Sequence, residues 1–195
     1  MGERWPRDAE QTRRRLLDAA RDEFAAVGIA GARVDRIAAA AGSNKAQIYH
    51  YFGSKDGLFD AVFEEIARTT VDEIPIDATD LPGYAGRLFD SYRQRPWVQR
   101  LATWYRLERG ADSALEIIRS GNSAKIAAIA AAQADGTVPD TFTPEELLGL
   151  VLHLSGFWSA TTPEYAALVD GIDPGRRREV VVLAVAALVG PPPGR

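Results

Sequence analysis

The fold of this 195-residue chain is decided by residues 33–58, which read RVDRIAAAAGSNKAQIYHYFGSKDGL. Gly42 divides the stretch, since a glycine readily takes the backbone conformation that ends a helix. Asn44 can cap a further helix from residue 45 to about 51, because its side chain accepts a backbone N–H. The helix before Gly42 is predicted by apolar residues at helical spacing: Val34, Ile37, Ala38 and Ala41. Two short helices around a glycine-containing turn are typical of a helix-turn-helix.

The second helix of this motif has an apolar and a polar side. Ile48 and Phe52 lie four residues apart, so we expect both to face neighbouring helices in the core. The residues left to point outward are Lys45, Ala46, Gln47, Tyr49 and His50. The helix is therefore expected to present polar groups while its apolar side holds it in place.

Longer helices are predicted on both sides of the motif. The preceding one carries an apolar stripe, can be capped by Asp8 or Thr12 and is expected to stop at Gly28; the stripe is Leu16, Leu17, Ala20, Phe24 and Val27. The following one can be capped by Ser54 and must end before Pro75. Further helices are predicted over residues 81–94, 96–109, 112–134, 144–160 and 174–189. Alternating strand patterns do not exceed a few residues, so the predicted fold class is all-α.

Composition restricts the class of protein. With 46% hydrophobic and 26% charged residues, the chain is typical of a globular protein. The sequence contains no cysteine, which excludes disulfides, thiolate zinc sites and cysteine nucleophiles. A secretory signal is not expected, because no apolar run follows the charges of residues 1–8. A membrane span is not expected either, because the longest strongly apolar stretch, residues 180–189, is shorter than the roughly 20 residues a span needs. We therefore expect a cytoplasmic protein.

Charge is distributed unevenly along the chain. The net charge is −4, but residues 1–55 hold ten basic and seven acidic residues, which leaves them at +3 and the remainder at −7. Because proteins bind DNA non-specifically by neutralising phosphates, this asymmetry favours a DNA-facing N-terminal end.

Residues 33–58 and the helix before them resemble the signature of TetR-family regulators. The matching features are an Ile-Ala pair in the first short helix, Ala-Gly at the turn, a Tyr-His-Tyr-Phe cluster, Ser-Lys and a leucine opening the next helix. The resemblance implies that the second short helix enters the major groove and that the following helix leads into a C-terminal helical body. It also implies a disordered arm over residues 1–8, a DNA-binding domain over 9–70 with its helix-turn-helix at 33–52, and a ligand-binding and dimerisation domain over 71–190.

Side-chain chemistry supports a DNA contact at this motif. Gln47 can pair with an adenine edge and Lys45 with a guanine edge, and the remaining polar groups can reach phosphates. The residues expected to contact DNA are Arg33, Asn44, Lys45, Ala46, Gln47, Tyr49, His50, Tyr51 and Lys55. The run of arginines at 13–15 is interpreted as a solvated helix face in preference to a DNA contact. His50 is not expected to bind a metal, because the only other histidine is His153 and zinc needs at least three protein ligands.

Two positions depart from the family pattern. Arg33 stands where the family has Ser or Thr, and Ser43 where it has Val. Arg33 can contact a phosphate with more charge than a hydroxyl, or it can be solvated. Both departures leave open an alternative function, a helical ligand-binding adaptor without DNA binding.

The C-terminal half is rich in large aromatic residues. Such residues usually form the core, but a ligand pocket also combines apolar walls with a few polar groups. The candidate ligand-binding residues are Trp104, Tyr105, His153 and Trp158. Their chemistry predicts an apolar or aromatic small-molecule effector. The last helix has more than one apolar stripe, and the family forms a four-helix bundle with a twofold mate; the candidate interface residues are Leu150, Val180, Leu183, Ala184 and Ala187.

The function expected from these features is that of a homodimeric repressor. It would bind a palindromic operator in double-stranded DNA and leave it when the effector binds. A small helical enzyme is the least favoured alternative, because the sequence shows no Ser-His-Asp spacing, no phosphate-binding glycine loop and no metal cluster. No enzymatic activity, metal or cofactor is expected.

Overall fold

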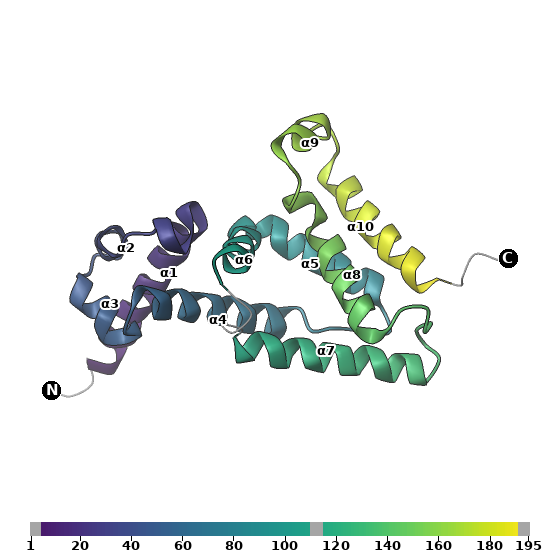
Figure 1. Cartoon of the computed structure of the whole chain (residues 1–195), viewed down its shortest axis with the longest axis horizontal. Coiled ribbons are helices and arrows are strands. Elements are labelled where there is room, and N and C mark those ends of the chain that lie inside the picture. The colour runs from purple at the N-terminus through teal and green to yellow at the C-terminus, as the bar shows by residue number, and fades with distance from the viewer. Residues whose placement is uncertain (1–4, 110–114, 191–195) are drawn as a thin grey trace. The chain divides into compact units, whose positions relative to one another are not determined.

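The structure, a computed structural model, describes residues 5–109 and 115–190. All regular elements in this part of the chain are helices, which confirms the predicted all-α class. Figure 1 labels them as α1 (Trp5–Gly31), α2 (Val34–Ala40), α3 (Lys45–Phe52), α4 (Lys55–Glu73), α5 (Leu81–Gln94), α6 (Pro96–Glu108), α7 (Glu116–Ala134), α8 (Pro144–Gly156), a 3-10 turn η2 (Phe157–Ser159), α9 (Pro163–Leu168) and α10 (Pro174–Val189). Among these described residues, no helix combines the length and apolar character that a bilayer crossing requires.

The first helix begins earlier and ends later than the sequence pattern predicts. Residues 5–8 are helical although they were expected to belong to a disordered arm, whose first four residues lie outside the described part. Thr12 is consequently inside α1, where its hydroxyl donates to the carbonyl of Asp8 at 2.8 Å instead of capping the start. Gly28 does have the expected positive φ, 74°, but the chain resumes helical geometry over residues 29–31. Gly28 therefore ends the first helical segment, as predicted, and residues 29–31 form a second segment after this kink within α1.

Later helix bounds follow the predicted pattern with two differences. The helix expected over 144–160 divides into α8 and η2, and the short helix α9 has no counterpart among the predicted helices. The predicted start of α7 at residue 112 lies outside the described residues. The start of α4 is explained by a local hydrogen bond. Ser54 Oγ accepts from Gly57 N at 2.9 Å, as expected for the cap of this helix.

The chain forms two compact units, of which the first contains Met1–Arg68 and Arg100–Ile117. Its core is built around Phe24 of α1 and Phe59 of α4, whose rings meet edge to face at 5.2 Å. The fully buried side chains around this pair include Leu16, Ile37, Ile48 and Leu58. Apolar faces of α1, α2, α3 and α4 thus share one core, which fixes how α3 is presented.

The second unit contains Thr69–Gln99 and Ile118–Arg195. In it, α5, α8 and α10 lie side by side (Figure 1). Their facing sides form a core that also receives Ile129 and Ala132 of α7; the central buried residues are Tyr84, Leu88, Leu147, Val151, Val181 and Val185. This unit is a helical body with its own apolar centre.

The chain passes between the units inside three helices, α4, α6 and α7. It leaves the first unit within α4, between Arg68 and Thr69, and re-enters it within α6 at Arg100. The described residues 100–109 and 115–117 therefore group with the helix-turn-helix in this division. The physical reason is packing: Tyr105 of α6 stacks on Phe63 of α4 with ring centroids 4.6 Å apart.

Candidate DNA-binding site

Helix α3 is held at both ends by local interactions. Asn44 has an extended backbone, and its side chain accepts the N–H of Gln47 at 3.0 Å, which confirms it as the cap. Gly53 ends the helix with φ of 73°, a conformation that glycine takes more easily than other residues. The eight residues between them are therefore a short helix with defined ends.

The core holds one side of α3 and leaves the other accessible. Ile48 is 0% exposed, as predicted. Phe52, expected in the core, is only half-buried, and the guanidinium of Arg13 lies over its ring at 5.6 Å. Lys45, Ala46, Tyr49 and His50 are exposed. A surface that contains polar groups is thus presented on a buried apolar anchor.

Several predicted DNA contacts come together in a groove between α1 and α3. Its α3 side is lined by Asn44, Gln47, His50 and Tyr51, and its α1 side includes Thr12 and Arg15. His50 and Tyr51 meet edge to face, with centroids 5.2 Å apart. Gln47 is half-buried in this groove, whereas Asn44 and His50 are exposed.

Lys45 is not a free cation in this structure. Its ammonium lies 3.1 Å from a carboxylate oxygen of Asp35 on α2, and half of each side chain or more is exposed. An exposed pair of this kind contributes about 0–1 kcal/mol. A guanine edge can therefore compete with Asp35 for Lys45.

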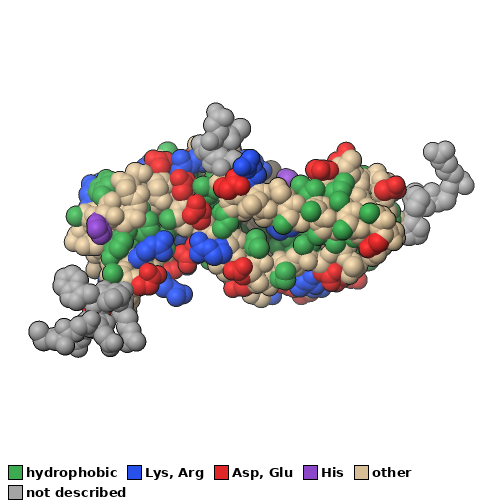
Figure 2. Space-filling view, turned by 90° about the horizontal axis from the view of Figure 1, so that it is seen from below, with side chains coloured by type: hydrophobic (Ala, Val, Ile, Leu, Met, Phe, Trp, Pro, Cys, Tyr) green, Lys and Arg blue, Asp and Glu red, His purple; other side chains and the backbone are tan. Residues whose placement is uncertain are grey.

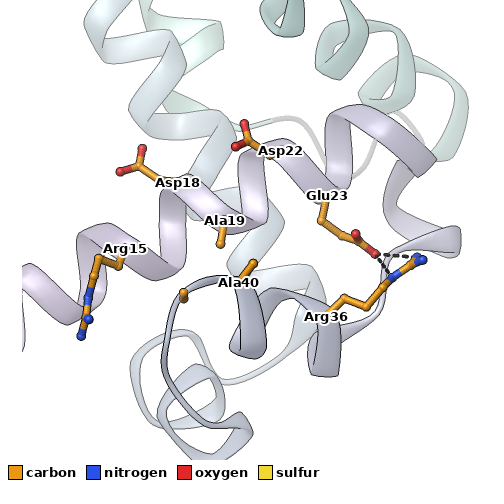
Figure 3. A pocket seen from close by; sticks show the side chains of 8 residues that line it. Arg15, Asp18, Ala19, Asp22, Glu23, Arg36 and Ala40 are labelled. Atoms are coloured by element: carbon orange, nitrogen blue, oxygen red, sulfur yellow. Dashed lines mark hydrogen bonds and ion pairs between the residues drawn. The ribbon is translucent and has the colours of Figure 1, made fainter.

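The start of α2 is held from another helix. Arg33 occupies the cap position without a side-chain cap, and its backbone N–H donates to Glu23 of α1 at 3.0 Å. Glu23 also pairs with Arg36 at 2.7 Å, the contact drawn in Figure 3. Glu23 therefore accepts the N–H of the cap residue itself, whereas a Ser or Thr side chain at position 33 would accept an N–H two or three residues further on. The exposed Arg33 side chain takes no part in the cap. The sequence pattern gave no signal for this role of Glu23.

Lys55 has a structural partner that the sequence pattern did not predict. Its ammonium donates to the carbonyls of Ala30 at 3.3 Å and Ala32 at 3.2 Å, which ties the start of α4 to the connection between α1 and α2. Lys carries three N–H donors, so one remains for a phosphate. Lys55 combines a packing role with its predicted contact.

Two adjacent residues at the end of α6 hold other helices of the same unit. The carboxylate of Glu108 accepts from Ile29 N at 3.1 Å and Ala30 N at 2.7 Å, and thereby caps the helical segment after the Gly28 kink. The kink also brings α1 close to α6, because a Cβ on Gly28 would lie 2.8 Å from the Trp104 ring.

Arg109 makes the matching contact with α4. Its guanidinium pairs with Asp56 at 3.2 Å and Asp60 at 2.8 Å. Burial raises the pKa of Asp60 above its ordinary value, and the attraction of Arg109 only partly opposes this. Glu108 and Arg109 together connect the end of α6 to α1 and α4.

The four candidate ligand residues divide between the units. Trp104 and Tyr105 belong to the first unit, and His153 and Trp158 to the second. The Trp158 indole donates to the Arg177 carbonyl at 3.1 Å, and the Arg177 guanidinium lies over its ring at 5.2 Å. His153 is exposed, and its Nδ1 lies 2.8 Å from the Gly149 carbonyl. Trp158 and His153 therefore already make contacts within the protein, although both were selected as ligand candidates.

The candidate interface residues lie on the outside of the second unit. Leu183 is 53% exposed and Leu150 37% exposed, while Val181 and Val185 on the other side of α10 are buried. Ala187 is exposed, and Val180 and Ala184 are half-buried. Helix α10 is thus apolar on a buried side and on an accessible one.

Charges on the surface are mixed in sign. Figure 2 shows Lys and Arg side chains interspersed with Asp and Glu on the face that it presents. The net charge of −4 gives no broad positive field either. DNA binding must therefore depend on the placement of individual cations.

The sequence matches two family profiles that together cover most of the chain. Residues 16–62 match the bacterial regulatory proteins of the tetR family. Residues 80–186 match the tetracyclin repressor-like C-terminal domain. The chain therefore belongs to the TetR family and is a DNA-binding transcriptional regulator with a helix-turn-helix. Members of this family bind operator DNA and form dimers.

Individual relatives agree with this assignment. The chain is 38% identical over 172 residues to the HTH-type transcriptional repressor SCO4008 of Streptomyces coelicolor. The matched region covers 87% of this chain and 89% of the relative. The crystal structure of SCO4942 from the same species, described as a transcriptional regulator, has a TM-score of 0.81 and 38% identity over 90% of this chain and 96% of that one. The fold is also that of FadR from Bacillus subtilis, solved with stearoyl-CoA: its TM-score is 0.64 at 17% identity, over 91% of this chain and 99% of that one.

Proposed function

We propose that this protein is a homodimeric repressor that reads a palindromic operator with α3 and is released from it by a small molecule. The observation that carries the proposal is the presentation of α3: Ile48 is 0% exposed, whereas Lys45, Ala46, Tyr49 and His50 are exposed. The relative SCO4008 carries the name of a repressor, which favours this sign of regulation. Such a protein acts by binding, in the cytoplasm where the chromosome lies, and not by catalysis.

In the bound state, Gln47 and Lys45 contact base edges. Gln47 pairs with adenine, Lys45 exchanges Asp35 for a guanine, and the methyl group of Ala46 can contact thymine. Arg33, Asn44 and the aromatic residues Tyr49, His50 and Tyr51 contact the sugar-phosphate backbone, together with the remaining donor of Lys55.

Replacement of Gln47 by Ala tests the base contacts. We expect a loss of about 1–3 kcal/mol in preference at a single operator position, with little loss on random duplex. Gln94→Ala is the matched control, because it removes the same side chain from an exposed position of α5. Fluorescence anisotropy with an operator fragment taken from the DNA upstream of its own gene, and with a scrambled copy, measures both affinities. Equal losses on the two duplexes for Gln47→Ala would remove it from the base-reading residues.

The second copy is proposed to pack on the accessible side of α8 and α10. Leu150, Leu183 and Ala187 make this side apolar, and the half-buried Val180 and Ala184 extend it. Two α3 helices then read half-sites about 34–36 Å apart, or a multiple of this.

A charge on this side tests the dimer. Leu183→Glu should shift the mass measured by analytical ultracentrifugation toward the monomer, since burying a carboxylate in an apolar interface is unfavourable. Operator affinity should fall with it, because the two half-sites are no longer bound by linked helices. Leu107→Glu is the control, as Leu107 of α6 is 67% exposed. A dimer that survives Leu183→Glu would rule out this interface.

Effector release is proposed to act through the helices that belong to both units. Each of α4 and α6 contributes residues to both, and Glu108 and Arg109 join the end of α6 to α1 and α4. A ligand in the helical body changes DNA affinity only if it binds the DNA-incompetent arrangement more tightly. Of the four ligand candidates, His153 and Trp158 belong to this body, and an apolar or aromatic compound fits their chemistry.

Native mass spectrometry of the purified protein can identify a retained small molecule. Adding the extracted compound back should weaken operator binding and also raise the melting temperature. A compound that raises the melting temperature without changing operator affinity would contradict the coupling.

A further inference from the structure

The three consecutive arginines at 13–15 of α1 have three different surroundings. The Arg13 guanidinium lies over the Phe52 ring at 5.6 Å, and Arg14 is exposed. Arg15 donates from Nη2 to the Thr12 hydroxyl at 3.2 Å. Successive helical residues point in directions about 100° apart, so the three side chains meet different surroundings. The run is therefore not a single solvated face.

Arg15 is the residue that faces the turn. Its Nη1 lies 3.8 Å from the point where a Cβ on Gly42 would be, and Gly42 is the turn glycine between α2 and α3. Arg15 also lines the groove between α1 and α3 together with Ser43, Asn44 and Gln47. Its positive charge consequently lies beside the predicted base reader.

The Arg15 side chain is oriented before any ligand arrives. Thr12 donates its hydroxyl proton to Asp8 O at 2.8 Å, which leaves its oxygen to accept from Arg15. An oriented side chain loses less conformational entropy when it binds.

The charge of Arg15 also remains uncompensated. Across the side chains that the structure describes, no carboxylate lies within ion-pair distance of Arg15, whereas Arg21 pairs with Asp18 at 3.0 Å and Arg36 with Glu23. Figure 3 shows Arg15 leaving α1 in a different direction from Asp18 and Asp22. The guanidinium is thus available to an anion from outside.

We propose that Arg15 binds a backbone phosphate of the DNA strand that passes through the groove between α1 and α3. The inference rests on the proposed entry of α3 into the major groove, because a strand that borders that groove must then run along one side of α3. The planar guanidinium can bind two phosphate oxygens at once. Asp8 lines the same groove and repels phosphate, which places the contact at Arg15 and not closer to the start of α1.

The salt dependence of binding tests this contact. Each neutralised phosphate contributes about 0.9 to the slope of log affinity against log salt concentration, measured between about 50 and 200 mM. In the full-length protein, Arg15→Ala should reduce the slope by about one unit, equally on the upstream fragment and on a random duplex. Arg14→Ala is the matched control, since it removes the same charge from the neighbouring position, and it should leave the slope unchanged.

Two further variants separate a phosphate contact from a structural role. Arg15→Lys keeps the positive charge but loses the planar guanidinium that can bind two phosphate oxygens at once. The salt slope should therefore be unchanged, while the affinity for DNA falls several-fold. Thr12→Val removes the orienting hydroxyl and should likewise lower affinity without changing the slope.

An unchanged slope in Arg15→Ala, or equal flattening by Arg14→Ala and Arg15→Ala, would overturn the proposal. If Arg15→Ala does not fold, a slope that falls in Arg15→Lys overturns it instead. Wild-type protein without salt-dependent DNA binding would contradict the proposed role of α3 itself, which is a separate outcome.

Discussion

Helix starts in the first unit are partly capped from distant helices, whereas those in the second unit are capped locally. In the first unit, Glu23 of α1 receives the N–H of Arg33 at the start of α2, and Glu108 of α6 caps the end segment of α1. In the second unit, each cap lies next to the helix that it serves: Asp80 for α5, Thr143 for α8, Thr162 for α9 and Asp173 for α10.

The two kinds of cap differ in whether they connect one helix to another. A local cap stabilises its own helix and transmits nothing, because both partners belong to the same turn. A cap supplied by another helix joins two elements, so that a displacement of one changes the other. The first unit contains the proposed DNA-reading helix, and its long-range caps make the arrangement of α1, α2 and α3 depend on α6.

The largest effect is expected from the core that holds the first unit together. Phe24→Ala should lower the free energy of unfolding by about 3–5 kcal/mol, because Phe24 is fully buried against Phe59. Chemical denaturation followed by circular dichroism measures the change, with Phe24→Leu as a milder control. If the two units unfold in separate transitions, only the transition of the first unit should shift. A single transition that shifts as a whole would show that the two units unfold cooperatively.

Comparing one long-range cap with one local cap gives an intermediate effect. Glu108→Ala and Thr143→Ala should each cost about 0.5–2 kcal/mol of stability, since each leaves backbone N–H groups without a side-chain acceptor. Only Glu108→Ala should also weaken DNA binding, because only Glu108 supports α1. Glu108→Gln retains an acceptor oxygen and should fall between Glu108→Ala and wild type. Equal DNA-binding losses for Glu108→Ala and Thr143→Ala would contradict the distinction.

The smallest effect is expected in the core of the second unit. Tyr84 is 0% exposed, and its hydroxyl has no hydrogen-bond partner among the described residues. Tyr84→Phe should therefore be neutral or stabilise the fold by about 1 kcal/mol at neutral pH, as an unpartnered buried hydroxyl is unfavourable.

The same variant makes a prediction about pH. Burial, with a smaller contribution from Tyr92, raises the pKa of Tyr84 to about 12. An unfolded tyrosine ionises near pH 10, so the unfolded state loses its proton first and stability falls as pH rises from about 10 to about 12. Tyr84→Phe should lose less stability than wild type over this interval in thermal unfolding. An equal or steeper loss in the variant would mean that the folded protein does not raise the pKa of Tyr84.

The parts of the site that the sequence predicted correctly depend on neighbouring residues. Asn44 caps α3, Gly42 and Gly53 have positive φ, and Ile48 is buried, all as the spacing indicated. These features arise within one or two helical turns, where side-chain reach is set by helix geometry. Phe52 is the exception, since its position in the pattern indicated the core but the structure places it at the surface edge under Arg13.

What the sequence by itself determined about this protein is its all-α class, most helix bounds and the polar and apolar sides of α3, because hydrophobic spacing and local caps act over a few residues. Only the tertiary structure decided that Glu108 caps a segment 79 residues before it, that Tyr105 packs on α4, and that Arg15 faces the turn while Arg14 does not. These pairings follow from how α1, α4 and α6 pack, and packing depends on the shapes of all the surfaces that meet in the core.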